Sequence, residues 1–99
     1  WNHGRISRAQ VEERLKAFEG PKEDGIFLAR QKDKDCFSVG VQFPEDGPPK
    51  FVLFEKKEDK WFVDKNYETP RGDTLAKAVE DVLVDLGVCN ADGVPKPDA

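Results

Sequence analysis

The sequence predicts an α+β fold, with a central antiparallel β-sheet flanked by one α-helix on each face. A helical pattern lies near each end of the chain, and strand patterns fill the middle. The helical patterns span residues 7–18 and 73–86. The strand patterns span residues 26–30, 36–43, 51–54 and 61–63, and a short strand is expected near Val94. Short strands between single helices are typical of α+β domains, in which the helices cover the sheet.

The first helix begins at a capping signal. Ser7 can cap it, and Gln10 three residues later completes a capping box. Val11, Leu15 and Phe18 follow at intervals of four and three residues, so they form one apolar stripe along the helix. This stripe is expected to pack on the sheet.

The second helix is expected to take Asp73 as its N-cap and to stop at Gly87. Its apolar residues recur at helical spacing and define the face that packs on the sheet. They are Leu75, Val79, Val82 or Leu83, and Leu86.

The clearest strand pattern, at residues 36–43, alternates between two kinds of side chain. One face is apolar, and the other is small or polar. The apolar face carries Phe37, Val39, Val41 and Phe43, and the other face carries Cys36, Ser38, Gly40 and Gln42. Residues 56–60 are charged and are expected to form a solvated hairpin connection between the next two strands.

Length and composition restrict the class of protein. The 99 residues suffice for one domain, and because the chain starts on Trp1 we expect residues 1–99 to be a module cut from a longer protein. A net charge of −4 gives no general basic field for nucleic acid. Two cysteines and one histidine match neither a disulfide scaffold nor a zinc set, so a reduced, cytoplasmic setting without metal or cofactor is expected. No apolar run approaches the roughly 18 residues of a membrane span, so no membrane insertion is expected.

Two arginines are predicted on faces that their neighbours cover. Ile26, Leu28 and Arg30 share one face of a strand, and Arg8 falls on the inward stripe of the first helix. A guanidinium in low dielectric needs an anion, and a cation at a helix N-terminus is unfavourable because the macrodipole is already positive there. The anion is either a nearby carboxylate or a ligand. The residues alone leave both alternatives open.

Five short motifs occur in order along the chain and together resemble the Src homology 2 (SH2) domain family. They are Trp1 to Arg8 (W-x-H-G-x-I-x-R), Gly25 to Arg30 (G-x-F-L-V-R, with Ala29 for Val), Phe37-Ser38-Val39, Asp73-Thr74-Leu75, and Ala91 to Val94 (A-D-G-L, with Val for Leu). The resemblance implies the sandwich of a sheet between two helices. It also implies a module that binds phosphotyrosine peptides.

The resemblance supplies an anion for both arginines. It implies that Arg30 forks two hydrogen bonds to the phosphate and that Arg8 contacts phosphate and ring. A phosphotyrosine carries about −1.5 to −2 charge and three strong acceptors. Arginine matches that geometry bidentately, whereas lysine does not.

The chain departs from the family after the strand arginine, where Glu-Ser is usual and Gln31-Lys32 stands here. We expect Lys32, with Lys34, to replace the serine hydroxyl with charge. Counting back from Trp61 assigns two further family positions: the pocket histidine falls on Lys50 and the following lysine on Val52. Cys36 and Ser38 are expected to face the phosphate pocket.

The resemblance also implies that two loops read the peptide residues after the phosphotyrosine. Here the loops are residues 64–72 and 88–92. The residues expected to contribute to peptide specificity are Phe51, Val52, Tyr67 and Val88, with Tyr67 either a pocket wall or a core residue. The expected partners are tyrosine-phosphorylated peptides or proteins, bound by a monomeric module.

Little in the sequence suggests an enzyme. His3 is the only histidine, and the resemblance makes it structural; neither cysteine lies in a phosphatase-type loop. The alternative function is an SH2-like fold used as an intramolecular or phosphate-independent interaction domain. The discriminating feature is whether Arg8 and Arg30 converge on an open pocket or are closed off by acids such as Asp33 or Asp35.

Overall fold

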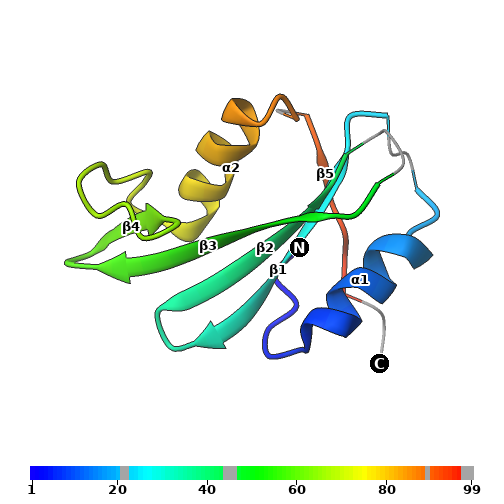
Figure 1. Cartoon of the computed structure of the whole chain (residues 1–99), viewed down its shortest axis with the longest axis horizontal. Helices are drawn as coiled ribbons and strands as arrows, with labels where there is room; N and C mark the ends of the chain where they lie inside the picture. Colours follow the sequence, from blue (N-terminus) through cyan, green and yellow to red (C-terminus); the bar gives the residue numbers. More distant parts are fainter. Residues whose placement is uncertain (21–22, 44–46, 89, 97–99) are drawn as a thin grey trace.

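The computed structural model describes residues 1–20, 23–43, 47–88 and 90–96. This part of the chain forms two helices and five strands, with four strands between the helices (Figure 1). In chain order they are α1 (Arg8–Ala17), β1 (Ile26–Asp33), β2 (Cys36–Gln42), β3 (Lys50–Lys57), β4 (Lys60–Val63), α2 (Leu75–Asp85) and β5 (Asp92–Gly93). No helix within these ranges is long and apolar enough to cross a membrane.

The strands form one sheet in the order β4-β3-β2-β1-β5. The first four are antiparallel to their neighbours, as predicted, whereas β5 pairs parallel with β1. The N-terminal segment pairs with the same edge of β1, through a bridge between Asn2 and Ala29. At the opposite edge, Trp61 of β4 pairs with Gly72. Short segments therefore add backbone pairing at both outer edges of the sheet, along β1 and along β4.

The two helices lie on opposite faces of the sheet, which confirms the predicted α+β architecture (Figure 1). Alternate side chains of β1 separate between two apolar clusters. Ile26 and Leu28 pack under α1, and Phe27 and Ala29 pack under α2. Arg30 continues the first of these series, so it lies on the α1 face.

The N-terminus of α1 has the predicted capping box. The Ser7 hydroxyl accepts from the backbone N–H of Gln10, and the Gln10 side chain accepts from that of Ser7. Val11 and Leu15 are buried on the sheet. The helix approaches closely at Gly40, where a Cβ would lie 2.8 Å from a methyl group of Val11. The absence of a side chain at Gly40 therefore sets the depth at which α1 packs.

The predicted N-cap of the second helix is wrong by one residue. Thr74 caps α2, and its hydroxyl accepts from the backbone N–H of Lys77. Asp73 instead accepts a hydrogen bond from Lys60 Nζ at 2.5 Å, and this contact lowers the pKa of the Asp73 carboxyl. The carboxylate therefore ties the β4 hairpin to the helix start. The buried face of α2 is close to the predicted one: Ala78, Val79, Val82 and Leu83.

The strands are longer than predicted at both hairpins. Strand β1, predicted to end at Arg30, continues to Asp33, and the chain turns at Lys34 and Asp35. The β1–β2 register shifts between Gln31 and Asp33. Likewise β3 and β4 extend to Lys57 and Lys60, which leaves a two-residue turn.

Candidate functional site

Arg30 is the centre of the site. It lies directly opposite Ser38 in the β1–β2 ladder, half-buried on the α1 face. Its Nε is buried without a hydrogen-bond partner among the described residues, and Nη1 donates only one long bond, 3.5 Å, to the Ile6 carbonyl. None of the ion pairs within the described ranges includes Arg30, so Asp33 and Asp35 do not neutralise it. Leaving such a donor unpaired costs about 1–3 kcal/mol, which an anionic ligand would offset.

Three rows of side chains surround Arg30 on this face of the sheet. Residues directly opposite one another in an antiparallel ladder point the same way. Arg30 and Ser38 are therefore in line with Leu53, while Cys36 is in line with Glu55 and Gly40 with Phe51. The face thus combines one arginine with small residues, two apolar side chains and two carboxylates, since Asp33 pairs with Cys36 in the same row as Glu55.

The prediction that Arg8 lies on the buried stripe of α1 is wrong. Its side chain is 65% exposed and reaches over β3, with the guanidinium carbon 4.2 Å from the centre of the Phe51 ring. Its Nε also lies 3.8 Å from Glu12, an exposed pair that contributes little. Because Arg8 is the first residue of α1, its long side chain can leave the stripe and reach water. It still lies on the Arg30 side of the sheet.

Ser38 and Cys36 lie on the same face of the sheet as Arg30. Ser38 is buried beside Arg30, and Cys36 is half-buried two residues away on the same face. Burial and the Glu55 carboxylate raise the pKa of the Cys36 thiol, against an opposing effect of Lys32. Lys32 is exposed at the β1–β2 register shift. Lys34 is exposed in the hairpin turn.

The register assumed for β3 is wrong. Lys50 pairs with Val41 and Val52 with Val39, and both valine partners belong to the core under α2. Lys50 and Val52 thus point away from Arg30, and the two positions on the Arg30 face are Phe51 and Leu53. A slip of one residue along a strand reverses the face of every side chain. The assumed register failed for this reason.

The residues expected to read the peptide divide into buried and exposed ones. Val52 and Val88 are only 2% and 4% exposed, within the core under α2, so they offer no surface to a peptide. Phe51 lies on the other face, beneath Arg8. Tyr67 is 40% exposed and is therefore not a core residue.

The loop that carries Tyr67 is held at two points. The Tyr67 hydroxyl donates to a Glu55 oxygen at 2.7 Å, and this bond raises the pKa of the phenol. Arg71 binds Asp81 at 2.6 Å and also Asp85, both on α2. Sequence reasoning missed Glu55 and Leu53, which follow Phe51 at the two-residue spacing of one strand face. That spacing is the signal that could have found them.

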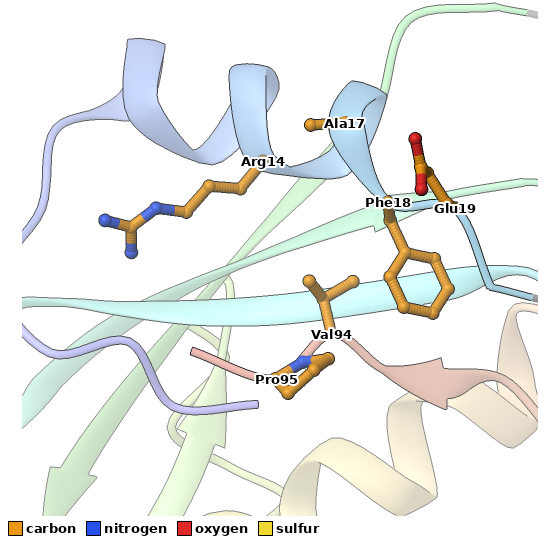
Figure 2. A pocket seen from close by; sticks show the side chains of 6 residues that line it. All are labelled: Arg14, Ala17, Phe18, Glu19, Val94 and Pro95. Carbon is orange, nitrogen blue, oxygen red and sulfur yellow. The ribbon is translucent and has the colours of Figure 1, made fainter. Parts of the chain in front are cut away.

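A second cation on α1, Arg14, lies on the same side of the sheet but is not a competing anion site. It lines an open hollow of about 270 Å³ with Phe18, Val94 and other residues (Figure 2). Figure 2 shows the Arg14 guanidinium extending away from the Phe18 ring. It donates to His3 Nδ1 at 2.9 Å, while His3 Nε2 donates to the Val94 carbonyl at 2.7 Å. Arg14 is thus engaged by the protein, in contrast to Arg30.

Comparison with known families agrees with this geometry. A family model described as SH2 domain matches residues 1–77, a range that includes both Arg8 and Arg30. Comparison with curated proteins gave no match. Domains of this family are generally non-catalytic intracellular modules that bind phosphotyrosine in signalling proteins. The matched range covers more than half of the 99 residues, and the chain belongs to the SH2 domain family.

Proposed function

We propose that this domain is a non-catalytic adaptor module that recognises phosphotyrosine-containing peptides in tyrosine-kinase signalling, with Arg30 as the main phosphate ligand. One observation carries the proposal: the Arg30 guanidinium is partly buried, has an unpaired Nε, and forms no ion pair within the described part of the chain. A phosphate dianion offers the hydrogen-bond acceptors that the Arg30 guanidinium lacks within the protein.

The surroundings of Arg30 favour an aryl phosphate. Leu53 gives the face an apolar side chain against which a phenyl ring can pack, and Phe51 beside it lies beneath Arg8. Arg8 supplies a second cation at the helix end, and its exposed guanidinium can reach phosphate and ring. Ser38 and Cys36 leave space beside Arg30 because they are small. Lys32 and Lys34 add positive charge from the hairpin.

We assign the reading of the peptide residues that follow to the loops at 64–72 and 88–92. Tyr67 is the exposed aromatic of the first loop, and its hydrogen bond to Glu55 connects this loop to the Arg30 face. We do not assign ligand contacts to three residues expected from the sequence: Lys50, Val52 and Val88. Lys50 lies on the other face of the sheet, and the two valines are buried. The module would act as a monomer in the cytoplasm and would bind proteins rather than nucleic acid.

Three peptides of one sequence test the proposal: a phosphotyrosine peptide, its tyrosine form and its phosphoserine form. Isothermal titration calorimetry should show binding of the first only. Truncation of Arg30 should cost about 2–5 kcal/mol of binding free energy. Arg30→Lys should cost nearly as much, because lysine cannot donate two parallel hydrogen bonds to the phosphate. Arg14→Lys is the matched control and should bind as the unmodified domain does. Equal binding of all three peptides would refute the proposal.

A second candidate function is a phosphate-independent interaction domain. The observation in its favour is that, in the observed register of β3, the apolar Phe51 and Leu53 occupy the Arg30 face, where the resemblance implies a histidine and a lysine. In that case the unphosphorylated peptide would bind as tightly as the phosphorylated one. The same titration therefore separates the two functions.

A further inference from the structure

We propose that Phe51 is a positioning residue for Arg8: its ring is a platform that holds the Arg8 guanidinium in place, so that the aromatic ring of the ligand packs on the opposite face of the guanidinium. The inference rests on the proposed function and identifies the part of the site that recognises the ring rather than the phosphate. The ligand class is an aryl phosphate.

The Phe51 ring is fixed from below. It is half-buried and packs against the cluster under α1 that includes Val11 and Leu15. A Cβ built on Gly40 would lie 3.2 Å from the ring, so the ring rests directly on the backbone of β2. The missing side chain at Gly40 thus makes room for the ring, and the close packing restricts its motion.

The Arg8 guanidinium lies on this ring with its carbon 4.2 Å from the ring centre, within the range of a cation–π contact. Its only ion pair among the described residues is the contact to Glu12 at 3.8 Å. An exposed arginine samples many rotamers, and ordering them opposes ligand binding. The platform orders part of this side chain in advance. Because Arg8 is 65% exposed, the side of the guanidinium away from Phe51 is open to a ligand.

This arrangement adds affinity only when the ligand carries a ring. A guanidinium between two rings makes a cation–π contact on each side, whereas a phosphate on a short aliphatic stem makes contact only at the hydrogen-bonding edge. Phe51 should therefore govern the preference for aryl over alkyl phosphates, through Arg8. Leu53, next on the same face, extends the apolar surface toward Arg30.

The test measures a ratio of two affinities by NMR titration: phenyl phosphate against methyl phosphate, which have the same charged group with and without a ring. In Phe51→Leu this ratio should fall about 2- to 5-fold, the size of one exposed cation–π contact. Phe51→Trp should restore it, because tryptophan also presents a π face. In the Arg8→Ala background, Phe51→Leu should leave the ratio unchanged, since the platform then has nothing to hold.

The control is Phe43→Leu, a partly buried phenylalanine that packs on the opposite core. It should leave the ratio unchanged, and urea unfolding confirms that each variant is folded. An equal loss of both affinities in Phe51→Leu, or the same fall of the ratio with and without Arg8, would overturn the inference while leaving the proposed function standing. Failure of the unmodified domain to bind a phosphotyrosine peptide would instead overturn the proposed function.

Discussion

Replacement of Arg30 by methionine should stabilise the domain while abolishing its binding. In the folded protein the Arg30 Nε is buried without a partner, which costs about 1–3 kcal/mol. The long bond to Ile6 at 3.5 Å offsets about 0.5 kcal/mol of this at most. Methionine keeps the apolar stem of the side chain, ends at the position of Nε and removes the charge together with the unpaired donor. We therefore expect a gain of roughly 1 kcal/mol in the free energy of unfolding.

The assay is urea unfolding, with and without a phosphotyrosine peptide. For a domain of this size, a gain of about 1 kcal/mol raises the midpoint by roughly 0.5–1 M urea. Saturating peptide, at about 100 times its dissociation constant, should add about 2.7 kcal/mol to the unmodified domain and nothing to Arg30→Met. A higher free energy of unfolding together with the loss of peptide binding in Arg30→Met would show that Arg30 serves the ligand rather than the fold.

Arg14→Met is the matched control, because Arg14 is also a half-buried arginine on the α1 side but donates to His3. Its replacement should destabilise the domain by about 1 kcal/mol, since the His3 acceptor loses its partner. If Arg30→Met also destabilised the domain by more than about 1 kcal/mol, the Arg30 guanidinium would already be satisfied within the protein, and the argument for a ligand would fail.

Three further predictions concern the scaffold. The pKa of His3 is lowered, mainly by burial and also by the charge of Arg14. The unfolded chain therefore binds a proton at His3 more readily than the folded domain does. The free energy of unfolding should be at its full value above about pH 6.5 and fall as the pH drops below it. Urea unfolding at pH 7.5 and pH 5 should show this loss in the unmodified domain and less of it in His3→Gln, and equal losses would contradict the assignment. Gly40→Ala should destabilise the domain by about 1–3 kcal/mol, because the added Cβ would meet Val11 at 2.8 Å and Leu15 at 3.3 Å; an unchanged thermal midpoint would show that α1 moves freely. Tyr67 is the only tyrosine, so ultraviolet titration should report a phenol pKa above its ordinary value that returns to normal in Glu55→Gln, and a normal value in the unmodified domain would mean that the hydrogen bond does not persist in solution.

The local signals of the sequence predicted the helices and the facing of β1. Ser7 and Gln10 defined the start of α1 because capping depends on only a few neighbouring residues. Alternation in β1 placed Arg30 on a covered face, and the structure has it on the α1 face. The central residue of the site could therefore be found from local pattern alone.

The facing of β3 could not be predicted in the same way. Residues 51–54 are apolar on both faces, so their period does not distinguish one face from the other. The length of the hairpin to β4 was also unknown, and the pairing of Lys50 followed from an assumed length. The prediction for Arg8 was wrong for a different reason. Helical spacing gives the direction in which a side chain leaves the backbone, but a long side chain at a helix end can bend away toward water.

The pairing along the two outer strands also bears on how copies of the domain behave at high concentration. An unpaired strand edge is a template for another chain, and sheets that leave long edges open tend to aggregate. Here residues 1–4 and β5 occupy the outer side of β1, while Arg71 and Gly72 bond to Trp61 on the short strand β4. Backbone groups that could recruit a neighbouring molecule are thus already bonded at these positions, which lowers the tendency of the domain to associate there through its sheet edges.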